Sequence, residues 1–187
     1  MFWLKLFEYK LDISYSEYGI YPRTYSGIKG IFFHQFIHGD WEHLIYNSVP
    51  FFLGSLSLFV FYPKSASKVL FLSYLLPGIL VWIFARQTYH IGLSGVNYSI
   101  IAFLLFSGLI RRDAKSLVVS MIIILFYSSM IVGLFPVQKG VSFESHIAGF
   151  LIGIVLVFIF RKNDPIDKFD WESESSDLDH DNTVEKL

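Results

Sequence analysis

Residues 90–110, HIGLSGVNYSIIAFLLFSGLI, join a polar turn to a long apolar run. The run Leu93–Ile110 is long enough to cross a bilayer as an α-helix, which needs about 20 mainly apolar residues. At its start, Ser94 stands in the sequence Gly92-Leu-Ser-Gly95. Because glycine is unfavourable within a helix, membrane insertion alone does not explain these small residues at the start of the span.

The composition of the whole chain is typical of a polytopic membrane protein. Of the 187 residues, 53% are hydrophobic and 17% are charged, whereas soluble domains carry about 25% charged residues. The net charge of −1 gives no sign of a nucleic-acid partner. The chain has no cysteine, which excludes disulfides, a thiolate nucleophile and cysteine metal ligands.

Four further apolar runs accompany the first. The predicted spans are Leu44–Tyr62, Val69–Ala85, Leu93–Ile110, Leu117–Phe135 and Phe143–Phe160. In lipid the backbone must satisfy its own hydrogen bonds, which favours helices throughout. The expected fold class is therefore an all-α polytopic membrane protein with five clear transmembrane helices.

The basic residues predict the orientation of these spans. Eight of them follow the first, third and fifth spans: Lys64, Lys68, Arg111, Arg112, Lys115, Arg161, Lys162 and Lys168. The alternate turns hold Arg86 and Lys139. We therefore expect a cytoplasmic C-terminus, and the short loops and compact core indicate the plasma (inner) membrane of a bacterium.

The two ends of the chain differ from its apolar centre. Residues 1–11, MFWLKLFEYKL, are too short to span a membrane and include three charged side chains. We expect either an interfacial helix or the outer end of a short or truncated first transmembrane helix. Residues 163–187 hold nine acidic residues and little apolar content, which predicts a disordered cytoplasmic tail.

Polar side chains are predicted to gather at one depth in the membrane. With the expected orientation, three spans begin at the outer face, and each starts with polar groups: His43 and Asn47, then Ser94, then His146. His43 and Asn47 share a helix face because they are four residues apart. Polar groups inside a membrane are costly and suggest function by default.

These side chains form a set that suits acyl transfer. Serine becomes a nucleophile when a base removes its proton, and histidine is the usual base. His43, Asn47 and the backbone N–H of Ser94 can donate hydrogen bonds to a developing oxyanion. Gly92 and Gly95 would then let the backbone bend and let a substrate or a neighbouring helix approach closely.

Each feature also has a purely structural interpretation. Small residues mediate helix packing in membranes, and His43 with Asn47 could simply hold two helices together. A single histidine such as His146 is more often an interfacial or satisfied core residue than a base. Glu144, two residues before His146, could be the acid of a triad, but residues i and i+2 do not share a helix face, so we expect it to be a solvated loop residue. The combination is more specific than any one of its parts.

A metal site is not expected in this chain. His34, His38 and His43 could suggest metal ligands, but no HExxH sequence is present and carboxylates at suitable spacings are sparse. We therefore expect neither a metal nor another cofactor.

Three ordered motifs resemble those of the rhomboid intramembrane serine proteases. The sequence HGDWEHLIYN resembles the H-x4-H-x3-N stretch of that family, here His38, His43 and Asn47. The sequence GLSGVNY resembles its G-x-S-G element, with Tyr98 four residues after the serine. The sequence SHIAGFLIG resembles its H-x2-G-x3-G element, here His146, Gly149 and Gly153. The match covers about residues 20–162.

This resemblance implies a rhomboid-like helical bundle with a Ser94–His146 catalytic dyad. It implies oxyanion donors from His43, Asn47 and the Ser94 backbone, and packing of Tyr98 against His146. The implied substrates are single-span proteins of the lipid bilayer, cut near the outer membrane face. Gly92, Gly95, Gly149 and Gly153 would support close packing, and His38 would line a wet cavity.

The resemblance also implies a domain organisation. Residues 1–162 would form the membrane domain, with a stub and outer loop over 1–42, transmembrane helices over 43–162, and the tail over 163–187. The family's first outer loop usually carries a Trp-Arg pair, whereas this chain has Pro22-Arg23. Ser145 replaces an alanine, and Asn97 is more polar than the family pattern.

Two other functions compete with the endopeptidase. A catalytically inactive, client-binding relative would usually lack the serine or the histidine, and both are present here. A small transporter could use His34, His38 and His43 as a proton relay. That function would not explain why glycines surround Ser94, and no pair of broken helices is apparent.

Overall fold

The computed structural model describes residues 1–137 and 140–164. Its helical elements follow the chain in this order: α1 (Phe2–Leu11), η1 (Ser16–Tyr18), α2 (Gly27–Phe33), η2 (His34–Phe36), α3 (Trp41–Phe61), α4 (Ala66–Phe84), α5 (Ser94–Arg111), α6 (Ala114–Tyr127), η3 (Ser128–Leu134) and α7 (Phe143–Phe160). The described residues form no extended strand, and only Ile20 and His90 pair as an isolated bridge. The all-α prediction is confirmed.

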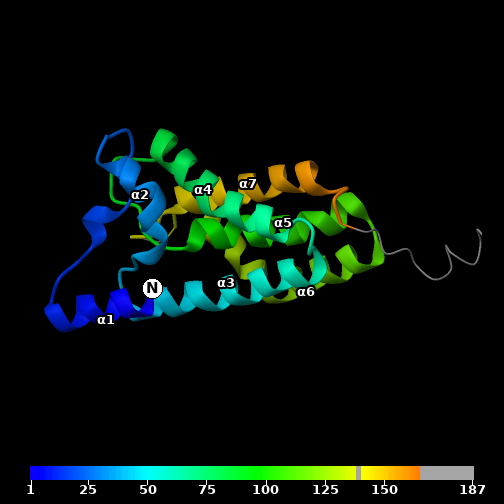
Figure 1. Cartoon of the computed structure of the whole chain (residues 1–187), viewed down its shortest axis with the longest axis horizontal. Helices are drawn as coiled ribbons and strands as arrows, with labels where there is room; N and C mark the ends of the chain where they lie inside the picture. The colour runs from blue at the N-terminus through cyan, green and yellow to red at the C-terminus, as the bar shows by residue number, and fades with distance from the viewer. Residues whose placement is uncertain (138–139, 165–187) are drawn as a thin grey trace, which may run out of the picture.

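The five predicted spans correspond to α3, α4, α5, α6 with η3, and α7. Each of these five segments is long and apolar enough to cross a membrane. They run along the long axis of the molecule (Figure 1). The predicted limits differ from the observed ones by a few residues, as expected where caps rather than hydropathy end a helix.

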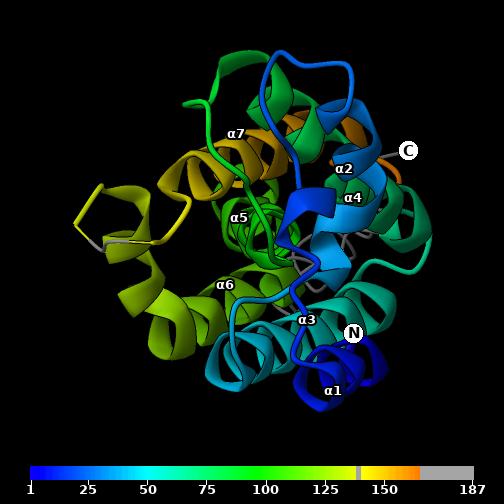
Figure 2. The same ribbon diagram turned by 90° about the vertical axis from the view of Figure 1, so that its left-hand side faces the viewer.

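Helix α5 is the central element of the bundle. Viewed from one end, it is surrounded by α3, α4, α6 and α7 (Figure 2). In its apolar window 67% of the residues are buried, against 17–44% in the other four spanning segments. Buried serines join it to its neighbours: Ser99 to Ser73 of α4 at 2.8 Å, and Gly108 N–H to Ser120 of α6 at 3.1 Å.

The fourth span departs from a uniform α-helix. Helix α6 ends at Tyr127, and Ser128–Leu134 continue as the 3₁₀ segment η3. The prediction of one regular helix over Leu117–Phe135 is therefore modified in its last two turns. Carbonyl groups of η3 accept side-chain hydrogen bonds from Tyr98 of α5 and His146 of α7.

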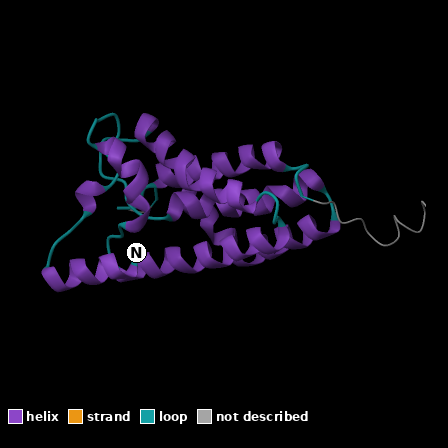
Figure 3. Ribbon diagram, in the orientation of Figure 1, coloured by secondary structure: helices purple, strands orange, loops and turns teal. Residues whose placement is uncertain are grey.

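The longest loops gather at the end where α3, α5 and α7 begin (Figure 3). There, Arg23 donates from Nη1 to the carbonyls of Ile83 and Ala85 at 3.2 and 2.7 Å. The indole of Trp82 donates in return to the Thr24 carbonyl at 2.9 Å. A cation at a helix C-terminus is favourable, so Pro22-Arg23 anchors its loop to the end of α4.

The N-terminal segment forms helix α1, which lies beside the start of α3 (Figures 1 and 2). Lys5 donates to the carbonyls of His38 and Gly39 at 3.0 and 2.7 Å. Glu8 pairs with Lys5 at 3.2 Å and accepts from the Tyr15 N–H at 2.8 Å. These contacts attach α1 to the segment that leads into α3.

At the opposite end, a buried polar network joins three loops. Asp113 pairs with Arg111 at 2.9 Å, and both side chains are almost fully buried. Asp164 accepts from the Lys64 N–H at 2.7 Å and from the Ser65 hydroxyl at 2.5 Å. Asn163 and Asp164 are thus described, whereas the remainder of the predicted tail, 165–187, lies outside the described residues.

Candidate active site

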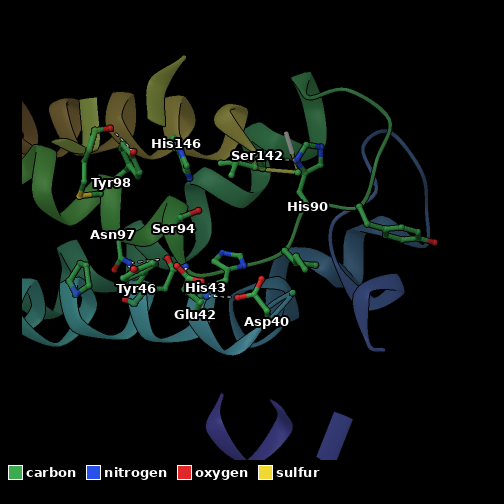
Figure 4. A pocket seen from close by; sticks show the side chains of 18 of the residues that line it. Asp40, Glu42, His43, Tyr46, His90, Ser94, Asn97, Tyr98, Ser142 and His146 are labelled. Carbon is green, nitrogen blue, oxygen red and sulfur yellow. Dashed lines mark hydrogen bonds between the residues drawn. The ribbon is translucent and has the colours of Figure 1, made fainter. Parts of the chain in front are cut away.

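A cavity of about 990 Å³ opens at the end of the bundle where α3, α5 and α7 begin. Its walls include His43 and Asn47 of α3, Ser94 and Tyr98 of α5, and His146 of α7. The segments before α3, α5 and α7, the end of α6 and η3 also contribute to the lining. Side chains from three separate helices therefore face one space (Figure 4).

Ser94 is the first residue of α5. It is reached through Gly92, whose φ of +104° lies in the region that favours glycine. A Cβ atom at Gly92 would lie only 2.9 Å from Nε2 of His43. Glycine at this position therefore serves both the backbone turn and the close approach of the His43 ring to the Ser94 segment.

The Ser94 side chain lies between His146 and His43 (Figure 4). Within the described part of the chain, its hydroxyl makes no hydrogen bond that fixes its direction, and no bond joins it to His146. Catalytic hydrogen bonds are often long in proteins without substrate and shorten when the substrate binds. The hydroxyl belongs to a cavity that His43 and His146 also line.

His146 is held by two contacts. Its Nδ1 lies 2.7 Å from the Gly133 carbonyl of η3. A carbonyl only accepts, so Nδ1 carries the proton and Nε2 keeps its lone pair. The Tyr98 ring stacks on the imidazole with centroids 4.2 Å apart and planes 11° apart. The arrangement leaves Nε2 able to accept a proton.

Tyr98 is in turn fixed at its hydroxyl. It donates to the Met130 carbonyl of η3 at 2.6 Å. A Cβ atom at Gly133 would lie 2.1 Å from the Tyr98 hydroxyl and 3.0 Å from His146 Nδ1. The 3₁₀ segment thus approaches both side chains closely, and only glycine fits at its point of contact.

Asn47 is oriented by Asn97 of α5. The Asn97 amide donates to the Asn47 carbonyl at 2.9 Å and to Asn47 Oδ1 at 3.1 Å. Asn47 Nδ2 donates one hydrogen to the His43 carbonyl at 2.9 Å. An amide nitrogen carries two hydrogens, so the second is available to a group in the cavity.

His38, expected to line a wet cavity, is not among the described residues that line it and is instead buried beside His43. Its side chain is 2% exposed, and the two rings lie edge to face with centroids 5.0 Å apart. Neither ring nitrogen has a hydrogen-bond partner among the described residues. Burial, followed by the proximity of His43, lowers the pKa of His38 to about 4, so this ring is neutral at pH 7.

Small residues bring α5 and α7 together. A Cβ atom at Gly149 would lie 2.1 Å from the Gly95 carbonyl, and one at Gly153 would lie 2.3 Å from the Ser99 carbonyl. Close backbone approach through small residues is typical of membrane helix pairs. This contact determines how near His146 comes to Ser94.

Glu144 differs from the solvated loop residue expected from the sequence. It lies in the first turn of α7 and pairs with Arg86 at 3.1 Å.

The described residues contain no cluster of three or more His, Asp or Glu side chains arranged to hold a metal ion.

Several contributors to this site were not identified from the sequence. The sequence marks Asn97 only as more polar than the family pattern, and η3 contributes backbone carbonyls, which no side-chain pattern reveals. His90 and Ser142 also line the cavity. The polar character of His90 next to the GLSG stretch was the one available signal.

Comparison with known proteins gives a family. The family model of the Rhomboid domain matches residues 26–163 of the chain. The chain belongs to the rhomboid family. Together with the five apolar helices, this makes it a multi-pass membrane protein. The match includes every helix that lines the cavity.

Similar proteins include uncharacterized proteins of mycobacteria. Those of Mycobacterium tuberculosis and Mycobacterium bovis are each 29% identical over 166 residues, covering 80% of this chain and 65% of the relative. One of Mycobacterium leprae is 28% identical over 146 residues, covering 70% and 55% respectively. The chain thus spans less than two-thirds of the length of these relatives.

Proposed function

We propose that this rhomboid-family chain is an intramembrane serine endopeptidase that acts on single-span membrane proteins. The main support is that Ser94 and His146 line one cavity while the Gly133 carbonyl holds the proton of His146 on Nδ1. That tautomer is the one a general base needs in order to accept the serine proton at Nε2.

In the proposed reaction, Ser94 Oγ attacks the scissile carbonyl carbon while His146 Nε2 removes the hydroxyl proton. The tetrahedral intermediate collapses, the C–N bond breaks, and His146 gives its proton to the leaving amine. A water molecule then attacks the Ser94 ester, with His146 again acting as base. The products are a carboxylic acid, an amine and the restored serine.

The oxyanion of the intermediate needs hydrogen-bond donors. We assign this role to the Ser94 backbone N–H, the His43 imidazole and the free Asn47 amide hydrogen. The Ser94 N–H stands at a helix N-terminus, where backbone donors lack intrahelical partners. Loss of one such donor typically lowers kcat by about 10²–10³-fold.

The lining of the cavity supports access for an extended peptide. Tyr46 and Pro50 of α3 face it from one side, and Tyr127 and Met130 of α6 and η3 also contribute. A substrate helix must unwind to expose its peptide bond, which favours small or helix-breaking residues near the cut. With the C-terminus of this chain in the cytoplasm, cleavage would occur near the outer face of the membrane.

The proposal is tested with a fluorophosphonate probe on the full chain in liposomes. The parent should be labelled, Ser94→Ala and His146→Ala should not, and Ser57→Ala should be labelled like the parent. Ser57 is a suitable control because its exposed hydroxyl bonds only the Leu53 carbonyl within α3. A folded parent that is not labelled would contradict the proposal and leave the inactive, client-binding function.

A further inference from the structure

A second serine–histidine pair lies in the cavity and joins the loop between α4 and α5 to the start of α7. Nδ1 of His90 lies 2.6 Å from the Ser142 hydroxyl, although 52 residues separate them. Ser142 Oγ lies 2.7 Å from Ser145 Oγ. These contacts form a continuous chain from the loop to the first turn of α7, and both His90 and Ser142 line the cavity (Figure 4).

The direction of each hydrogen bond in this chain is determined. Nε2 of His90 lies 2.9 Å from the Arg86 carbonyl, so Nε2 carries the proton. Nδ1 must then accept, and the Ser142 hydroxyl donates to it. Ser142 Oγ accepts in turn from the Ser145 hydroxyl and from the Ser145 N–H at 3.3 Å.

Ser142 is also the N-cap of α7, the helix that carries His146. Its carbonyl accepts from the His146 N–H at 3.4 Å and from the Ser145 N–H at 3.1 Å. An N-cap side chain that bonds the first turn fixes the start of a helix. A shift of Ser142 would therefore move the backbone at His146, one turn along the helix.

The loop itself is well placed to act as a fixed support. His90 and Ile20 exchange backbone hydrogen bonds at 2.9 and 3.0 Å, and Ile20 is fully buried. The Gly92 N–H donates to the His34 carbonyl at 2.8 Å. The backbone on both sides of the His90 ring is thus anchored to the N-terminal third of the chain.

We propose that His90 is a positioning residue, which holds His146 opposite Ser94 by fixing the Ser142 cap of α7. The inference rests on the proposed function, because it assigns His146 as the base. His90 itself needs no contact with substrate for this role. The salt bridge between Arg86 and Glu144, at 3.1 Å, connects the same loop to the same turn.

The charge state of His90 agrees with its role as an acceptor. Burial lowers its pKa, whereas the Arg86 carbonyl and Glu144 raise it and the Arg86 charge lowers it. His34 also faces it, from η2. The ring is therefore neutral near pH 7. Protonation would make Nδ1 a donor and force the Ser142 hydroxyl to turn away.

The test compares two pairs of variants in the full chain in liposomes. His90→Phe removes the acceptor, whereas His90→Asn offers Oδ1 in the place of Nδ1. Ser142→Ala removes the cap, whereas Ser142→Thr keeps it. We expect His90→Phe and Ser142→Ala to lower kcat by roughly 10- to 100-fold, as small misplacements of a catalytic group do. KM should change little. The conservative variants His90→Asn and Ser142→Thr should keep most of the activity.

A second measurement does not depend on activity. In ¹⁵N NMR of histidine-labelled protein, His146 should show the Nδ1-protonated tautomer in the parent. In His90→Phe and Ser142→Ala its signals should shift or broaden, while Ser57→Ala leaves them unchanged. If the parent proves inactive but these shifts occur, the proposed function fails and the positioning role of His90 stands.

Two results would overturn the inference. One is an unchanged kcat and unchanged His146 signals in both His90→Phe and Ser142→Ala. The other is probe labelling that persists in Ser94→Ala and disappears in Ser142→Ala, which would make the Ser142–His90 pair itself reactive. If His90→Phe does not fold, the Ser142 pair decides the question alone.

Discussion

The Tyr98 ring lies parallel to the His146 imidazole at 4.2 Å, and its hydroxyl is tied to the Met130 carbonyl at 2.6 Å. One side chain thus connects the proposed base to the 3₁₀ end of the fourth span. The stack restrains the plane of the imidazole, and the hydroxyl restrains the stack. Loss of the hydroxyl bond and loss of the ring stack should therefore have different effects on stability and on kcat.

Tyr98→Phe should keep the stack and lose the hydroxyl bond. We expect it to destabilise the protein by about 1 kcal/mol, the usual net value of a hydrogen bond, with a small loss of kcat. Tyr98→Leu should lose the stack as well and lower kcat much further. Peptide cleavage and thermal unfolding in the same lipid measure both effects. Equal kcat for the two variants would contradict this assignment.

Asn97 should act on catalysis through Asn47. It donates to the carbonyl and to the side-chain oxygen of Asn47, and its own side chain is buried. Asn97→Leu should lower kcat by roughly tenfold without a matching change in KM, since loss of an oxyanion donor costs up to about 10³-fold. The Asn47→Ala, Asn97→Leu double variant should be little worse than Asn47→Ala alone. Additive losses would show that the two residues act independently.

Gly92→Ala should impair both stability and activity. Its φ of +104° strains any side chain, and the new Cβ would meet His43 Nε2 at 2.9 Å. Gly140→Ala is a matched control, because Gly140 has a φ of +81° and, among the described residues other than its chain neighbours, no atom lies within 4 Å of its Cβ position. Both should lose about 1–2 kcal/mol from the backbone strain. Only Gly92→Ala should also displace His43 and lower kcat strongly, as kcat and thermal unfolding would show.

Acid should destabilise the fold through its buried histidines. Burial lowers the pKa of His34 to about 4. Burial, followed by the proximity of His43, also lowers the pKa of His38 to about 4. The unfolded chain binds these protons near pH 6.5, whereas the folded chain does not until about pH 4. The free energy of unfolding should therefore decrease as the pH is lowered from about 6.5 to about 4, by up to about 1.4 kcal/mol per pH unit for each histidine.

The pH dependence is measured by thermal unfolding in mild detergent between pH 7 and pH 4.5. His38→Asn removes one of the two groups, so its unfolding temperature should fall less steeply than that of the parent. The same slope in both proteins would contradict the assignment to His38. Comparison at pH 7 separates this effect from any direct loss of packing.

The main framework of the chain follows from its amino-acid sequence. Apolar run length alone located the five spans, because the thickness of the bilayer fixes how many residues a helix needs. Side chains at the start of three spans located Ser94, His146, His43 and Asn47, because spacing along a helix determines depth and face. Gly149 and Gly153 could likewise be recognised as a small-residue contact.

The contacts that hold these groups in place depend on tertiary packing. The His146 proton depends on the Gly133 carbonyl, and a backbone carbonyl has the same chemistry at every residue, so sequence cannot single it out. Asn97 meets Asn47 across 50 residues, and His90 meets Ser142 across 52. Such pairs depend on the crossing of whole helices. Local periodicity fixes which face a residue occupies, whereas packing decides which residue lies opposite.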